Sequence, residues 1–127
     1  IAAGQCDVGL TNTYYLARLK TKDAGFAVAP FWPNQNDRGV HVNISGAGVT
    51  KYGKNRANAI KLIEFLSSPE AQNVFADANY EYPANPKVMP HPLIAAWGTF
   101  KADQVDVAAA GEWQVAAVKL LDRVGYK

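Results

Sequence analysis

The stretch Leu10–Leu19, LTNTYYLARL, sets two adjacent tyrosines, Tyr14 and Tyr15, directly behind Asn12 and Thr13. Either Asn12 or Thr13 can cap a helix that begins at the tyrosines, because both residue types accept hydrogen bonds from first-turn N–H groups. Adjacent helical residues point about 100° apart, so the two phenol rings cannot share one core face. At least one ring therefore turns away from the core, or both rings reach toward something that they share.

Outward from this stretch, apolar runs alternate with helical patterns. Apolar residues recur at helical spacing after Asn55, and Ser68-Pro69-Glu70 is typical of a second helix start. The expected strands are residues 6–10, 26–34 and 39–45, and the expected helices are residues 14–20, 55–68, 69 onward and 108–124. The proline-rich residues 79–92 predict an irregular loop. Strands that alternate with helices predict an α/β fold.

The composition is that of an ordinary globular chain. Of its 127 residues, 49% are hydrophobic and 19% are charged, with a formal net charge of +2. The charges are scattered, so the sequence offers no basic field for nucleic acid and no polybasic patch for a membrane. The single cysteine, Cys6, excludes an internal disulfide and a paired-cysteine metal site, and we expect it to be a small buried hydrophobe.

The beginning of the chain resembles the end of a helix. Ile1–Ala3 is followed by Gly4, and a glycine is the residue that most often stops a helix. A chain that opens on a helix C-terminus has lost what came before it. We therefore expect the chain to be a fragment of a longer protein.

The sequence contains parts of enzymatic motifs, but none of these motifs is complete. The stretch GVTKYGKN, residues 48–55, fits most of a phosphate-binding loop, yet Asn55 stands where the Ser or Thr that holds Mg²⁺ is required. Asn55 has a simpler use as the cap of the following helix. His41 and His91 have no obvious acid or hydroxyl partner in the sequence, and Ser45 lacks the glycine pattern of a nucleophile elbow. The sequence therefore does not predict an enzyme.

The tyrosine pair admits two interpretations. In the first, one ring packs inside while the other lies on the surface by its edge, as is common for tyrosine. In the second, a highly charged cation holds both phenols as phenolates at neutral pH. Anionic oxygen suits a hard trivalent ion such as Fe³⁺, and phenolate is a known iron ligand. An anion could then cancel the remaining charge at the helix N-terminus.

Four stretches together resemble a known family over essentially the whole chain. They are CDVGLTNTYYLARL, HVNISGAGVTKYGKNRANAIKLIEFLSSPEAQ, NYEYPANP and WGTFKAD. They are similar to the ferric-iron-binding proteins of bacterial ABC transporters, the extracytoplasmic, transferrin-like members of the periplasmic binding protein class. The NTYY motif is the most specific part of this resemblance. The resemblance implies the C-terminal part of a two-lobed, α/β periplasmic binding protein (type II) fold.

The resemblance also assigns residue roles. It implies Tyr14 and Tyr15 as phenolate ligands of Fe³⁺, with Asn12 helping to hold a synergistic anion such as phosphate or carbonate. Tyr80, Tyr82 and Trp97 match family positions, and we interpret them as packing residues. By the same resemblance, residues 1–45 lie in the second lobe, residues 46–95 in the first lobe, and residues 96–127 form a helical return to the second lobe. The other iron ligands belong to the missing N-terminal portion.

The implied function is capture of ferric ion in the periplasm, or at an extracytoplasmic membrane anchor, and delivery to an inner-membrane ABC permease. The chain is then neither an enzyme nor a nucleic-acid-binding protein. A second class stays open at this point. A relative of the same fold could bind an oxyanion or a small organic solute without metal, using Asn12 and the helix start.

Overall fold

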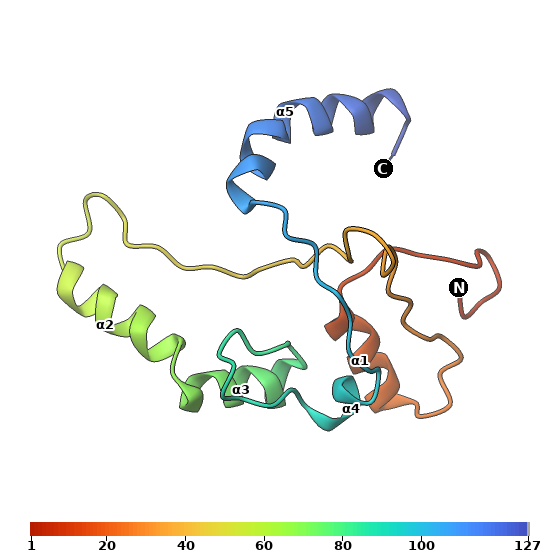
Figure 1. The fold of residues 1–127 in the computed structure, drawn as a ribbon, viewed down its shortest axis with the longest axis horizontal. Coiled ribbons are helices and arrows are strands. Elements are labelled where there is room, and N and C mark those ends of the chain that lie inside the picture. The colour runs from red at the N-terminus through yellow and green to blue at the C-terminus, as the bar shows by residue number, and fades with distance from the viewer. Residues whose placement is uncertain (127) are drawn as a thin grey trace. The chain divides into compact units, whose positions relative to one another are not determined.

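The computed structural model describes residues 1–126, and this part of the chain contains five helices (Figure 1). They are α1 (Thr13–Lys22), α2 (Arg56–Leu66), α3 (Pro69–Asn79), α4 (Pro92–Ala95) and α5 (Val107–Arg123). The helices expected after the tyrosine motif, after Asn55, from Pro69 and near the C-terminus are confirmed within a few residues. The short α4 follows the predicted proline-rich loop and was not expected.

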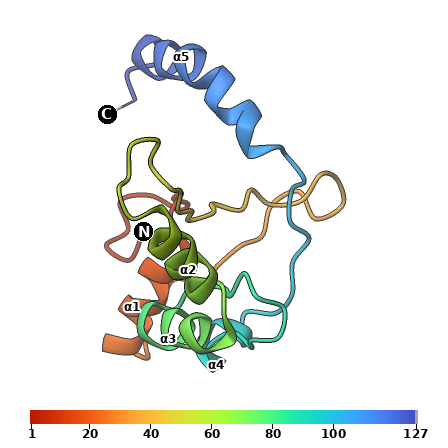
Figure 2. The same ribbon diagram turned by 90° about the vertical axis from the view of Figure 1, so that its left-hand side faces the viewer.

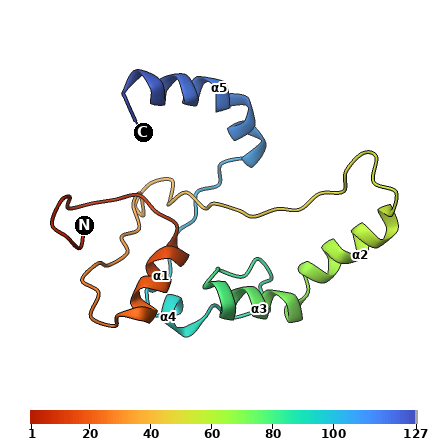
Figure 3. The same ribbon diagram turned by 180° about the vertical axis from the view of Figure 1, so that it is seen from behind.

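The predicted strands do not form a sheet among residues 1–126. The only strand-like pairing described there is a single parallel bridge between Val40 and Ala102. Residues 43–50 run as an extended segment without regular pairing (Figure 3). A strand is stable only when its N–H and C=O groups pair with a neighbouring strand. The expected sheet is therefore not formed by the described residues alone, which are mostly helical, because their extended segments lack strand partners.

Contacts divide the chain into two compact units, and the first contains α1 to α4. Unit 1 comprises Ile1–Phe31 and Asn43–Thr99. Within it, α4 packs beside α1, and α3 follows α2 end to end across a short turn, in contact with it (Figures 1 and 2). The buried apolar side chains all belong to this unit: they are Leu16, Ala17, Ala71, Ala76, Val88 and Ile94. This small core holds the start of α1 in place.

Unit 2 comprises Trp32–Val42 and Phe100–Lys127, and polar contacts bind its two segments together. The Val40 N–H donates to the Lys101 carbonyl at 2.9 Å, and the Asp103 N–H donates to the Val40 carbonyl at 2.8 Å. The Gln35 side chain accepts from the Lys101 N–H at 2.7 Å. The Trp32 and Phe100 rings lie 4.7 Å apart between centroids. The side chain of Gln35 thus extends the pairing that the backbone begins.

Local signals explain where the helices begin and end. The Ser68 hydroxyl accepts a hydrogen bond from the Ala71 N–H at 3.3 Å, and the Asp106 side chain accepts one from the Ala108 N–H at 2.9 Å. Both bonds satisfy donors that the first turn of a helix leaves open. Tyr80 ends α3 in the left-handed conformation, with φ at 59°. Gly125, two residues after the end of α5, has φ at 67°.

Much apolar surface remains exposed in both units. No residue of α2 or α5 is buried. An apolar stripe at helical spacing on α5 is open to solvent, and Trp113 in it is 68% exposed. The residues of this stripe are Trp113, Ala116, Ala117, Leu120, Leu121 and Val124. Cys6 is exposed as well, so the expectation that it is buried is wrong; it lies in a segment, residues 1–11, that is exposed throughout. Over the described residues, no helix has the length and apolarity that a bilayer crossing requires.

Candidate metal centre

The tyrosine pair lies in the first turn of α1, and neither ring is a core residue. The next two residues, Leu16 and Ala17, are the ones that α1 buries. Tyr14 is therefore only half-buried, and Tyr15 is 50% exposed. The two rings approach each other with centroids 4.6 Å apart and planes tilted by 53°. Adjacent residues on a helix normally diverge, so the close rings bring two phenol groups to one place.

Asn12 precedes the helix but does not cap it. Its backbone is extended, and no N–H group of the first turn donates to its side chain. Instead, its Nδ2 donates to the Tyr14 Oη at 3.1 Å. Its Oδ1 accepts from the Nδ2 of Asn43 at 3.2 Å. The structure thus joins Asn12 to one tyrosine and leaves the first-turn N–H groups without a side-chain cap.

Asn43 is a residue of the site that the sequence analysis missed. It comes from the 39–45 segment, where period-two alternation placed it among the polar residues opposite the apolar face. That alternation predicted only that the Asn43 side chain would be exposed. Its neighbour Asn12 is 31 positions away in the sequence, so only the path of the chain brings the two amides together.

Electrostatics favour the neutral form of the Tyr14 phenol. The pKa of Tyr14 is raised above 10.0, first by the hydrogen bond with Tyr15, then by burial, and further by the nearby Tyr15 and Glu81 charges. Arg18 acts in the opposite direction, with its guanidinium carbon 5.6 Å from the centroid of the Tyr14 ring. A phenol with a raised pKa is protonated at neutral pH. Any cation that binds its oxygen must therefore displace a proton.

Other potential ligands are scattered. Among residues 1–126, no group of three or more His, Cys, Asp and Glu side chains is placed to hold a metal. His91 has a structural role, because its Nδ1 accepts from the Leu93 N–H at 3.1 Å and its ring meets the Tyr80 ring edge-on. A metal held at the tyrosine pair would have phenol oxygens as its ligands from this chain.

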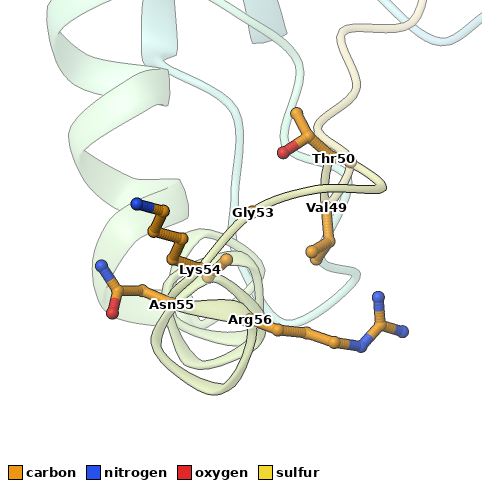
Figure 4. A pocket seen from close by; sticks show the side chains of 8 residues that line it. Val49, Thr50, Gly53, Lys54, Asn55 and Arg56 are labelled. Carbon is orange, nitrogen blue, oxygen red and sulfur yellow. The ribbon is translucent and has the colours of Figure 1, made fainter.

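A surface hollow lies at the start of α2, on the stretch that fits most of a phosphate-binding loop. Its volume is about 320 Å³, and it is lined by residues from Gly48 to Ala59. Asn55 stands at the predicted cap position, but its side chain makes no capping hydrogen bond. Figure 4 shows Lys54 and Arg56 extending to opposite sides of the helix start. The lysine therefore does not reach over the loop as a phosphate-binding lysine must.

Comparison with known proteins adds the family context. Residues 2–96 match the model of the family described as bacterial extracellular solute-binding protein. Iron uptake protein A2 of Synechocystis sp. is 41% identical over 100% of this chain and 39% of its own length. The major ferric iron-binding protein of Neisseria meningitidis is 32% identical over 98% of this chain and 38% of its own length.

Solved structures agree with these relatives. The Trichodesmium protein IdiA (FutA), in complex with iron and citrate, superposes on 99% of this chain with a TM-score of 0.91 and 48% identity, and the match covers 42% of that protein. Apo FutA2 from Synechocystis superposes with a TM-score of 0.90 and 41% identity, over 99% of this chain and 42% of that chain. The extended segments therefore follow part of a periplasmic binding protein fold although they form no sheet here.

The match is to a part of each relative, since the chain spans about two fifths of the length of the curated relatives it matches. The family match covers most of the chain, and its members are solute-binding proteins of transport systems rather than enzymes. This chain belongs to the bacterial extracellular solute-binding protein family, and it is homologous to part of the ferric iron-binding periplasmic proteins.

Proposed function

We propose that Tyr14 and Tyr15 bind Fe³⁺ as phenolates in an extracytoplasmic iron-binding protein. The observation that carries this proposal is the pair of tilted phenol rings, 4.6 Å apart, at the start of α1. A hard trivalent ion favours anionic oxygen over other protein ligands. The relatives' names and the iron-and-citrate complex of a superposable protein support the same metal.

An anion beside the metal would complete the charge balance of the site. Two phenolates cancel two of the three positive charges of Fe³⁺, and a bound anion such as phosphate or carbonate cancels the rest. Asn12 is the proposed anion-binding residue, because its amide lies beside Tyr14 and the first-turn N–H groups of α1 have no side-chain cap. Such groups favour anions. The citrate in the related structure supports an anion that accompanies iron in that protein.

The proposal assigns the remaining ligands to sequence outside this chain. In the two-lobed arrangement, residues 1–45 and 96–127 belong to the second lobe and residues 46–95 to the first, and a missing N-terminal portion completes both. Closure of the lobes around iron would exclude water from the phenolate bonds. The closed protein would then deliver iron in the periplasm to an inner-membrane ABC permease.

Visible absorption after addition of ferric citrate tests this proposal in the complete protein. Iron bound by phenolates absorbs visible light by charge transfer, so we expect a coloured complex. We expect the Tyr14→Phe/Tyr15→Phe variant to stay colourless and to bind iron at least about 100-fold more weakly, because loss of a direct ligand exceeds the 10–100-fold effect of an outer-shell partner. Tyr52→Phe, at a tyrosine that is 85% exposed on another segment, is the matched control.

The same titration separates the metal-free alternative. A protein that binds an oxyanion or organic solute through Asn12 alone would bind phosphate or citrate equally well without iron and would show no visible band. It would also keep its affinity when both tyrosines become phenylalanine. Either result would overturn the phenolate proposal.

A further inference from the structure

Two amide side chains and one phenol form a directed chain of hydrogen bonds beside the proposed metal ligands. The Nδ2 of Asn43 donates to the Oδ1 of Asn12 at 3.2 Å. The Nδ2 of Asn12 then donates to the Oη of Tyr14 at 3.1 Å. Every donor in this chain points the same way, from the 39–45 segment toward the phenol oxygen.

An asparagine amide has one donating end and one accepting end, so a partner at one end fixes what the other end can do. Asn43 donates to Asn12 and thereby occupies its oxygen. The NH₂ group of Asn12 is consequently turned toward Tyr14. If Asn43 accepted instead, Asn12 would present its oxygen to Tyr14.

The two orientations of the Asn12 amide differ in free energy only when the Tyr14 phenol has lost its proton. A neutral phenol can donate or accept, so it satisfies either orientation of Asn12. A phenolate can only accept, and an amide oxygen turned toward it would be repelled. A hydrogen bond to a charged acceptor is also about twice as strong as a neutral one.

We propose that Asn43 is a positioning residue, which orients the Asn12 amide so that its NH₂ group supports the metal-bound oxygen of Tyr14. The inference rests on the proposed function, since it concerns how that same site is prepared for iron. Asn43 touches neither iron nor phenol in this role. It acts through Asn12, in the way that outer-shell partners orient metal ligands.

The test is a double-mutant cycle in the complete protein, with ferric citrate as the probe. Asn43→Asp keeps the size of the side chain but can only accept, so it reverses the orientation of Asn12. Asn43→Leu removes the bond without adding charge. Both changes are repeated in an Asn12→Ala background. There, Asn43→Asp still adds its negative charge, but the amide that Asn43 would orient is absent. Asn73→Asp, on the exposed surface of α3, is the control for the Asn-to-Asp change itself.

With Asn12 present, we expect Asn43→Asp to weaken iron binding about tenfold more than it does in the Asn12→Ala background. We also expect Asn43→Leu to shift the charge-transfer band to lower energy only when Asn12 is present, because the phenolate loses a hydrogen-bond donor. Equal effects in both backgrounds, or an unshifted band, would overturn the inference. A wild-type iron complex without any visible band would instead refute the proposed function, which keeps the two failures distinct.

Discussion

At the scale of single residues, proton competition governs the tyrosine pair. The hydrogen bond with Tyr15 is the first cause that raises the pKa of Tyr14 in the metal-free chain, and Arg18 only partly opposes it. The Tyr14 phenol is therefore not a ready-made anion at neutral pH. Iron must supply the free energy that removes both protons, so acidity and iron affinity are linked.

The first prediction concerns that linkage. Each bound ferric ion should release two phenol protons, so apparent affinity should rise about 100-fold per pH unit between about pH 6 and 8. The sign follows from the raised pKa of Tyr14, since the phenol is protonated throughout this window. Competition against a chelator, corrected for protonation of the chelator and hydrolysis of iron, measures the slope.

The single variants Tyr14→Phe and Tyr15→Phe provide the control for the slope. Each should reduce it to about tenfold per pH unit, because one proton is then released instead of two. A slope that is the same in wild type and in both variants would show that the phenols keep their protons. In the metal-free protein, the stability that Tyr14 contributes by its raised pKa is fully present below pH 10.0 and is lost only as pH rises through that raised value.

At the scale of elements, helices and strands differ in what they require from neighbours. The α3 helix begins at Pro69 because Ser68, Pro69 and Glu70 supply a cap, a proline and an acidic residue at three consecutive positions. Such local signals were sufficient to predict every helix of eight residues or more. The extended segments carry equally clear alternation, but only Val40 and Ala102 pair in the described chain. Pairing depends on segments that are distant in sequence, so local patterns could not predict it.

The same distinction separates the parts of the candidate site. Tyr14 and Tyr15 were predictable because their significance lies in being adjacent at a helix start. The contact of Asn12 with Tyr14 was not, because the sequence offered Asn12 only as one of two possible caps of the helix, beside Thr13. Asn43 depends on a contact across 31 positions. The sequence therefore predicted that the two phenols lie at a helix start, where the structure has them, and it gave no signal for the hydrogen bonds of Asn12 and Asn43.

The second prediction concerns Gly39, which allows the one parallel bridge to form. Its φ is 100°, and an added Cβ would come within 2.6 Å of the Lys101 carbonyl oxygen. Gly39→Ala should lower the free energy of unfolding by about 1–3 kcal/mol, since a strained backbone and a clash with another backbone combine. Urea unfolding of the complete protein measures the change.

Gly46→Ala is the matched control for this substitution. Gly46 has open space around its position and no positive φ, so alanine there should be close to neutral. If both alanine variants had the same free energy of unfolding, the close approach of residues 39 and 101 would not contribute to the stability of the protein.

At the scale of the whole molecule, both units leave large apolar side chains open to solvent. The stripe of α5 is one such set, with Leu120 48% and Val124 65% exposed. We expect the rest of the complete protein to cover this stripe.

The third prediction tests that cover. Leu120 lies on the α5 stripe, while Val115 points to the opposite side of the helix by the geometry of about 100° per residue. Leu120→Asp should lower the free energy of unfolding of the complete protein by about 3 kcal/mol, because it buries an unpaired charge. Val115→Asp makes a similar chemical change outside the stripe and should cost much less. Equal costs would mean that the stripe is not the covered face.

Resonance Raman spectroscopy of the iron-loaded complete protein, excited in its visible band, tests the central claim most directly. The account predicts phenolate vibrations bound to iron, weakened in Tyr14→Phe and in Tyr15→Phe and absent when both rings lose their oxygens. Iron that binds without these vibrations, or vibrations that persist in the double variant, would contradict it.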